Sequence, residues 1–81
     1  MISEIDVHGL TSEEALREVQ KYIVYLSKKN INYFEIIHGY SHGDTLKKLF
    51  SKASNFHSNR VLKVLPCWNA GRTCVFLIDR R

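Results

Sequence analysis

The sequence has no long apolar run, almost no proline and no repeats, and each of these absences excludes a class of protein. No stretch approaches the ~20 consecutive apolar residues that a membrane-spanning helix needs. With a single proline, Pro66, and four glycines in 81 residues, there is no linker or low-complexity tract. We therefore expect one domain over residues 1–81. The amino terminus lacks the basic start and apolar core of a secretory signal, which favours a cytoplasmic protein that makes no contact with membranes.

Cysteine is also scarce. The only two, Cys67 and Cys74, have a spacing that matches no common zinc-binding pattern. Because we expect a cytoplasmic protein, the sequence predicts two reduced thiols. Cys74 stands in an apolar run and is expected in the core.

The net charge of +4 is modest but unevenly distributed along the chain. Residues 1–20 carry five acidic side chains against Arg17 alone, whereas residues 21–81 carry eleven basic and three acidic ones. A one-sided basic surface attracts polyanions through its long-range field and through counterion release. This asymmetry points to nucleic acid as a partner, although many small proteins are basic for solubility alone.

The hydrophobic pattern predicts the order strand, helix, strand, helix, strand, strand. Strands are expected over residues 2–8, 32–37, 60–65 and 73–78. The first helix should run from a capping box at Thr11 and Glu14 to about Lys29. The second should start at Asp44 as its cap, with a buried stripe made by Leu46, Leu49, Phe50 and Ala53.

This order predicts an α/β (α+β) two-layer sandwich, in which a mixed four-stranded sheet carries two helices. Right-handed crossovers make the first strands parallel. The short connection over residues 66–72 predicts that the fourth strand pairs antiparallel with the third. In such sheets, ligands gather beyond the carboxyl ends of the parallel strands.

Asp6, His8 and His38 end the first two strands. Asp6 and His8 are two residues apart, so their side chains leave from one face; if the two strands are neighbours, His38 joins them at one edge. An aspartate fixes the tautomer of an imidazole, and a second imidazole can supply the opposite proton transfer in phosphodiester cleavage. Alternatively, a histidine before a glycine at a strand end only satisfies the backbone. No full set of metal ligands is visible, so we expect no metal and no cofactor.

The loop that follows His38 leads directly into the second helix. A helix N-terminus offers unpaired N–H groups and a positive dipole end, which together suit a phosphate. We therefore predict nucleic-acid contacts from Gly39, Ser41, His42, Gly43, Lys47 and Lys48. The alternative is that the glycines serve only a tight turn and that the lysines form a solvated face.

The last loop carries a tryptophan and an arginine. An exposed Trp68 can stack on a base, and Arg72 can bind phosphate. A tryptophan can equally be a lid over a core. Tyr40 has the same two readings.

Three motifs, in order, resemble the small MutS-related (Smr) domain, which occurs at the carboxyl end of certain MutS paralogues and as stand-alone proteins. The leading signature [LI]-D-[LV]-H-G-[LM] is matched by residues 5–10. The second, I-I-H-G-x-G-x-G-x-L, is matched by Ile36-Ile37-His38-Gly39 followed by Gly43 and Leu46. The closing strand G-x-T-x-V-x-L is matched within residues 70–77. One position departs: Ser41 replaces the middle glycine of the second motif, so the backbone of this loop is more restricted.

The resemblance implies a fold similar to the C-terminal domain of translation initiation factor three. It also implies DNA binding and, in several members, nicking of DNA or endonucleolytic cleavage of RNA. The D-x-H motif is the part tied to cleavage, so Asp6 and His8 inherit that role by position. The family is not uniformly catalytic, and fold analogy does not settle function.

Three hypotheses follow. In the first, the chain is an endonuclease for structured or branched DNA or for RNA: His8 is the general acid or base, Asp6 orients it, and His38 with Arg72 or Lys47 steadies the phosphate. In the second, the same basic edge binds DNA or RNA without catalysis. In the third, the chain is a protein-interaction adaptor, which only the amphipathic helices favour, and core packing explains those better.

Overall fold

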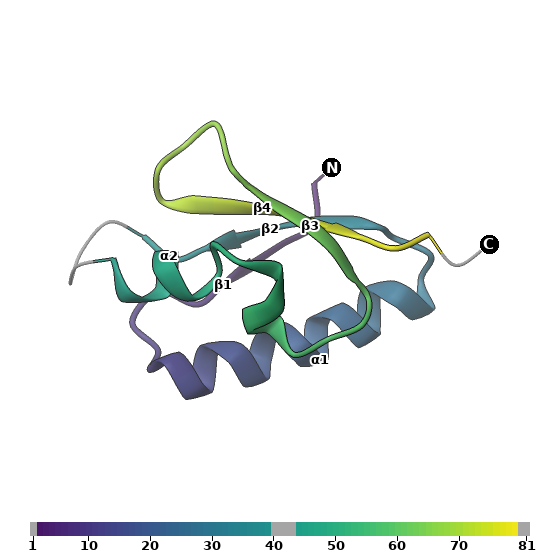
Figure 1. Cartoon of the computed structure of the whole chain (residues 1–81), viewed down its shortest axis with the longest axis horizontal. Coiled ribbons are helices and arrows are strands. Elements are labelled where there is room, and N and C mark those ends of the chain that lie inside the picture. The colour runs from purple at the N-terminus through teal and green to yellow at the C-terminus, as the bar shows by residue number, and fades with distance from the viewer. Residues whose placement is uncertain (1, 40–43, 80–81) are drawn as a thin grey trace.

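The structure, a computed structural model, describes residues 2–39 and 44–79. Its elements follow in the order β1 (Glu4–Asp6), α1 (Ser12–Lys28), β2 (Tyr33–Ile37), α2 (Thr45–Leu49), the 3-10 helix η1 (Ala53–Phe56), β3 (Val61–Pro66) and β4 (Arg72–Leu77). All three helices lie on one side of the sheet, and the β3–β4 connection rises on the other side (Figure 1). The predicted two-layer fold is therefore confirmed. Within the described residues, no helix has the length and apolar character needed to cross a membrane.

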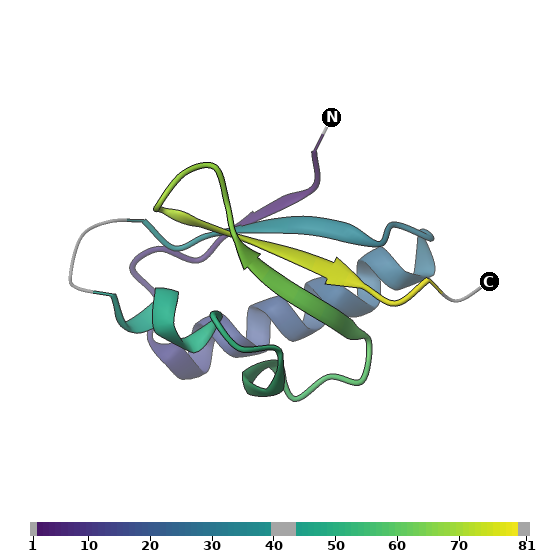
Figure 2. The same cartoon turned by 45° about the horizontal axis from the view of Figure 1, so that its top comes forward.

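The sheet is mixed, with strand order β1-β2-β4-β3. β1 pairs parallel with β2, and β4 pairs antiparallel with both β2 and β3. The parallel first pair and the antiparallel last pair match the sequence predictions. The sequence did not indicate that β4 also inserts between β2 and β3, which Figure 2 shows. As a result, β3 is an edge strand, and β4 lies beside the strand that ends in His38.

Helix α1 begins at the predicted capping box. Thr11 Oγ1 accepts a hydrogen bond from Glu14 N at 3.1 Å, and Glu14 Oε1 accepts one from Thr11 N at 3.0 Å. Loss of such a cap typically costs ~1 kcal/mol. The helix buries one face against the sheet. The core between the two layers consists of Val7, Ala15, Val19, Ile23, Leu26, Phe34, Ile36, Phe50, Phe56, Val75 and Leu77.

The second helix is shorter than predicted. α2 ends at Leu49, and Lys52 adopts an extended backbone (φ −126°, ψ 129°) before η1 begins, so Ala53 does not belong to the same helix. The side-chain amide of Asn55 donates to the carbonyl of Leu49 at 2.9 Å and satisfies an acceptor at the helix end. The break allows both Phe50 and Phe56 to enter the core, with ring centroids 5.3 Å apart.

Asp44 occupies the cap position of α2, as predicted, but its side chain makes no capping hydrogen bond. Its carboxylate lies 3.6 Å from Lys48 Nζ instead. The pair is exposed, so it contributes little to stability. Its effect is to offset part of the positive charge expected on this helix.

Cys67 and Cys74 form a disulfide, which shows that the prediction of reduced thiols was wrong. The β3–β4 register places Cys74 opposite Leu65, and the hairpin loop then brings Cys67 back over it, with the Cα atoms 5.2 Å apart. Cys74 is only half-buried and lies on the side of the sheet away from the helices, so its expected core position was also wrong. Without knowledge of the hairpin register, the two thiols could not be paired from their spacing.

The disulfide gives a first testable prediction. Closing a loop of this length stabilises a fold by about 2–3 kcal/mol in the chain-entropy model. Addition of a phosphine reductant should therefore lower the free energy of unfolding by about 2 kcal/mol, measured by denaturant titration followed by circular dichroism. The Cys67→Ser/Cys74→Ser variant should show the lower stability with and without reductant. A wild-type stability that does not respond to complete reduction would contradict this contribution.

Candidate active site and nucleic-acid interface

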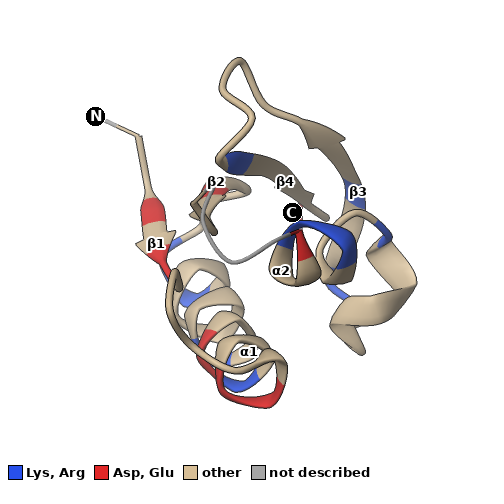
Figure 3. Ribbon diagram, turned by 90° about the vertical axis from the view of Figure 1, so that its left-hand side faces the viewer, with Lys and Arg blue, Asp and Glu red and all other residues tan. Residues whose placement is uncertain are grey.

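The predicted site residues lie at one end of the sheet but on both of its faces. Asp6 pairs with Ile37, so alternation along the strands sends Asp6 and His8 to the side without helices, and Val7 and His38 to the side that α1 covers. Figure 3 looks onto this end of the molecule, with α1 under β1 and β2. We call the helix-free side the open face; its side chains are Glu4, Asp6, His8, Tyr33, Glu35, Ile37, Lys63, Leu65, Arg72, Cys74 and Phe76.

Asp6 and His8 form a hydrogen-bonded pair on the open face. Asp6 Oδ1 accepts from both His8 Nδ1, at 2.5 Å, and the His8 backbone N–H, at 3.1 Å. The pair is followed by a tight turn in which Gly9 has φ 82° and the N–H of Leu10 donates to the carbonyl of Val7 at 3.1 Å. The sequence D-x-H-G therefore builds the pair within a single turn.

This pair has the arrangement of a base and its orienting group. The carboxylate can only accept, so His8 Nδ1 carries a proton and, in the neutral ring, Nε2 is left as the basic nitrogen. The hydrogen bond from His8 holds the pKa of Asp6 below its ordinary value, so Asp6 stays ionised. The side chains are 66% and 51% exposed for His8 and Asp6 respectively, so a substrate can reach them.

His38 is buried and fully occupied by the protein. Its Nδ1 lies 3.3 Å from the carbonyl of Gly39, and its Nε2 lies 3.0 Å from Thr73 Oγ1. Since the carbonyl can only accept, Nδ1 donates to it, and the Thr73 hydroxyl donates to Nε2. Burial lowers the pKa of His38, and the nearby charge of Lys47 acts in the same direction. His38 is thus a neutral ring that joins β2 to β4, which matches the alternative of a histidine that satisfies the strand end.

Arg72 lies on the open face, between two carboxylates. Its Nη1 donates to Glu4 at 2.6 Å and to Glu35 at 2.9 Å. Glu35 is nearly inaccessible, and its other oxygen accepts from the hydroxyl of Tyr33 at 2.8 Å; burial and this bond raise the pKa of Tyr33 to about 12. The charge of Arg72 is already matched, so the geometry favours a positioning role over the predicted phosphate contact.

Gly39 requires its glycine. It has φ 77°, and a Cβ there would meet His8 Cβ at 3.4 Å, so the turn packs against the Cβ of His8.

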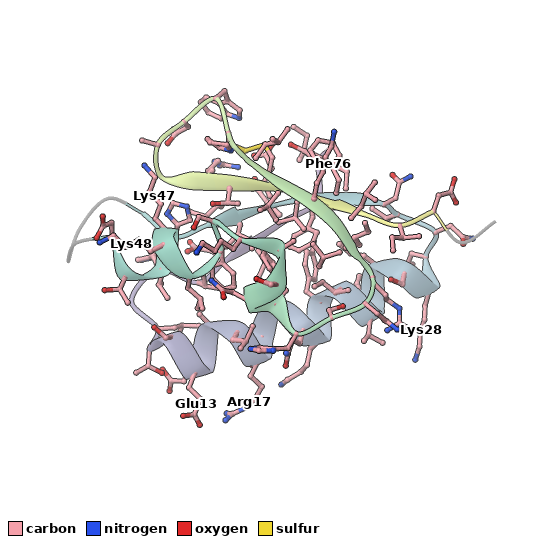
Figure 4. The ribbon with its side chains drawn as sticks, viewed as in Figure 1. Glu13, Arg17, Lys28, Lys47, Lys48 and Phe76 are labelled. Carbon is pink, nitrogen blue, oxygen red and sulfur yellow. A yellow bond between two sulfur atoms is a disulfide. The ribbon has the colours of Figure 1, made fainter. Side chains whose placement is uncertain are left out.

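Lys47 and Lys48 extend from α2 at the same end of the molecule (Figure 4). Lys47 lines a small cavity with Arg72 and Thr73, whereas Lys48 faces Asp44. The predicted contacts Tyr40, Ser41, His42 and Gly43 lie outside the described residues.

Comparison with known proteins identifies the family. The family model for the Smr domain matches residues 5–78, nearly the whole chain. The chain belongs to the Smr family. The crystal structure of the Smr domain of Thermus thermophilus MutS2 is similar to it with a TM-score of 0.76 and 23% sequence identity, over 95% of this chain and 99% of that one. A search of curated protein sequences found no match.

Membership assigns this Smr domain to a family that is generally nucleic-acid-binding and nuclease-related. The similarity to the MutS2 domain supports the fold alone at this level of identity. Within that fold, Asp6 and His8 form a pair beside Gly39, whereas His38 lies on the other face of the sheet. Among residues 2–39 and 44–79, Lys48 has an ion-pair partner in Asp44 and Lys47 has none.

Sequence reasoning missed the residues that hold the site in shape: Glu4, Tyr33, Glu35 and Thr73. One signal was available, because Glu35 interrupts an aromatic and β-branched strand, where a buried carboxylate requires a cationic or hydrogen-bonding partner. Thr73 carried no such signal, since its role depends on the β2–β4 register.

The lowered pKa of His38 predicts a pH dependence of stability in the Smr domain. Folded His38 binds a proton less strongly than the unfolded chain, whose ordinary value is 6.5. The unfolded state therefore takes up more protons as the pH falls, and stability decreases below about pH 6.5. His38→Gln should flatten the dependence of the free energy of unfolding on pH between about pH 7 and 5. His57→Asn, at an exposed histidine with φ 51°, is the control that should keep the wild-type slope. Equal slopes for His38→Gln and wild type would show that His38 does not carry the effect.

Proposed function

We propose that this Smr domain is an endonuclease in which His8 is the proton-transferring group and Asp6 orients it. The observation that carries the proposal is the Asp6–His8 pair itself, with Nδ1 held by the carboxylate at 2.5 Å and the ring exposed on the open face. A histidine whose distal nitrogen faces solvent, and whose proximal nitrogen donates to an ionised aspartate, suits general base catalysis. The D-x-H motif of the family falls on the same two residues.

In this mechanism, His8 Nε2 accepts a proton from the attacking hydroxyl as its oxygen forms a bond to phosphorus. The bond between phosphorus and the leaving oxygen breaks, and that oxygen takes up a proton from solvent. The hydroxyl is the adjacent 2′-hydroxyl in RNA or a water molecule in DNA. The Asp6 carboxylate stabilises the imidazolium that results. Lys47, which lines a cavity with Arg72 and Thr73 while Asp44 pairs with Lys48, supplies a cation for the phosphate at this end of the molecule.

A binding module without catalysis is the second candidate, and the positions of two residues favour it. His38 makes both of its ring hydrogen bonds within the protein, and Arg72 is paired with Glu4 and Glu35. Neither is free to act as the second proton-transferring group or the phosphate clamp that the sequence suggested. Cleavage would then depend on His8 alone, whereas binding needs only the basic residues at this end.

Substitution of the pair tests the first proposal. Purified wild-type protein should cut labelled branched DNA, plasmid DNA or RNA in a gel assay run with and without divalent metal ions. His8→Ala should reduce the cleavage rate ~10²–10⁴-fold while leaving affinity nearly unchanged, because a positioned acid or base contributes that factor. Asp6→Asn should reduce it less, because an amide oxygen still accepts both hydrogen bonds from His8.

Lys28→Ala, in the last turn of α1 at the other end of the molecule, is a matched control and should cut at the wild-type rate (Figure 4). Tight binding by the wild type without cleavage of any substrate, under any metal condition, would overturn the endonuclease proposal. The binding module would then replace it.

The two lysines of α2 give a prediction that both candidates share. Each phosphate neutralised by a lysine releases counterion, so affinity should fall steeply with salt. Lys47→Ala/Lys48→Ala should weaken binding and reduce the slope of log affinity against log salt by about 1–2. We expect Lys47→Ala alone to account for most of the change, because Lys48 is paired with Asp44. An unchanged slope in the double variant would show that both lysines form a solvated face only.

A further inference from the structure

Trp68 is the most exposed large apolar side chain among the described residues, with 76% of its surface accessible. It lies on the β3–β4 loop, which rises from the open face away from both helices and the core (Figure 1). The reading of this tryptophan as a lid over the core is therefore wrong. A large exposed aromatic ring offers apolar surface that contact with another molecule can remove from water.

The loop holds Trp68 in place. The adjacent Cys67 is bonded to Cys74 of β4, so one end of the loop is tied to the sheet. At the other end, Asn69 closes a turn: its side-chain oxygen accepts from Gly71 N at 2.8 Å, and its carbonyl accepts from Arg72 N at 3.0 Å. A restrained ring loses less conformational entropy on binding than a ring on a free loop.

Arg72 supports the ring from the sheet. Its guanidinium carbon lies 5.5 Å from the centroid of the Trp68 ring, within the range of a cation–π contact. Ion pairs with Glu4 and Glu35 fix the position of the Arg72 guanidinium next to the ring. The same ion pairs offset part of the negative charge of the two carboxylates next to the ring.

The strand register relates Arg72, and through it the ring of Trp68, to the Asp6–His8 pair. Asp6, Ile37 and Arg72 form one row across β1, β2 and β4 on the open face. With neighbouring strands about 4.8 Å apart, the row places Arg72 about 10 Å from Asp6. That is on the order of three stacked base steps along one strand. A strand whose phosphate lies at His8 therefore has a base within reach of Trp68.

We propose that Trp68 stacks on an unpaired nucleobase, and that the substrate of this domain is single-stranded, or carries unpaired nucleotides, next to the cleaved bond. The inference rests on the proposed endonuclease function for the position of the phosphate, but not for the stacking itself. A base inside a duplex already has both faces covered, whereas an unpaired base offers a free face to an aromatic ring. The stack does not require a particular base, since every base has such a face.

The sequence makes this stacking directly measurable. Trp68 is the only tryptophan, so fluorescence excited at wavelengths beyond the absorption of the four tyrosines reports on this ring alone. A short single-stranded oligonucleotide, as DNA and as RNA, should quench that fluorescence on titration into His8→Ala protein. A blunt duplex of the same sequence should quench it much less.

Affinity provides the second readout, by fluorescence anisotropy of labelled oligonucleotides. Trp68→Ala should weaken single-strand binding about 5- to 150-fold, the range expected for loss of one base–aromatic stack, and should leave duplex binding nearly unchanged. Trp68→Phe should retain most of the affinity. Tyr25→Ala is the matched control: Tyr25 is 53% exposed on α1, on the opposite layer, and its loss should have no effect.

The outcomes separate this inference from the proposed function. Unchanged Trp68 fluorescence on saturation with single strands, together with wild-type affinity in Trp68→Ala, would overturn the stacking site, whether or not the wild type cuts. Quenching together with the loss in Trp68→Ala supports the site even if no cleavage is found, in which case only the endonuclease proposal fails. Absence of binding to any single strand would overturn the stacking site alone, because cleavage of branched or plasmid DNA would still support the endonuclease.

Discussion

The antiparallel ladder between β2 and β4 is the constraint on which the rest of the site depends. It places Ile37 opposite Arg72 and Glu35 opposite Cys74. Because successive side chains alternate between faces, the same ladder sends Arg72 to the open face and the next residue, Thr73, to the face covered by helices. A slip of one residue would exchange the two faces and would bury a guanidinium in the core while exposing Val75. The hydrophobic pattern of β4 therefore fixes the register, and the register in turn assembles the polar contacts.

Those contacts explain how a carboxylate is tolerated at the centre of the sheet. Glu35 is 2% exposed, and a buried charge is costly by several kcal/mol unless it is paired and hydrogen-bonded. Arg72 and Tyr33 satisfy both of its oxygens, while Arg72 also reaches Glu4 on β1. One arginine thereby links β4 to two other strands. The network is best understood as a support for the open face, because its two carboxylates outnumber its one guanidinium and leave no positive charge with which to bind a phosphate.

Local patterns allowed much of the fold to be predicted from the sequence, and non-local pairings account for what could not be predicted. The capping box, the strand–helix order and the pairing of Asp6 with His8 all depend on residues within a few positions of one another. Three features depend on which strand lies next to which: the burial of His38 against Thr73, the pairing of Arg72 with Glu35, and the disulfide. The early end of α2 has a different cause: the gain from burying both Phe50 and Phe56 overrides the helical periodicity that continues through Ala53.

The division of the two histidines between the faces has a chemical consequence. A hydrolytic site with two imidazoles can use one as base and the other as acid, but only His8 is on the open face, and His38 is held neutral on the other. When only one of these two imidazoles is accessible, the site depends more heavily on how its substrate is positioned, because positioning alone can lower a barrier by several kcal/mol. We propose the restrained ring of Trp68 for that task, since it lies over Arg72, which is on the same row of the sheet as Asp6, and since the disulfide holds its loop. The proposed proton transfer at His8 and the proposed stacking at Trp68 would then use one surface, and an unpaired strand bound at one would also reach the other.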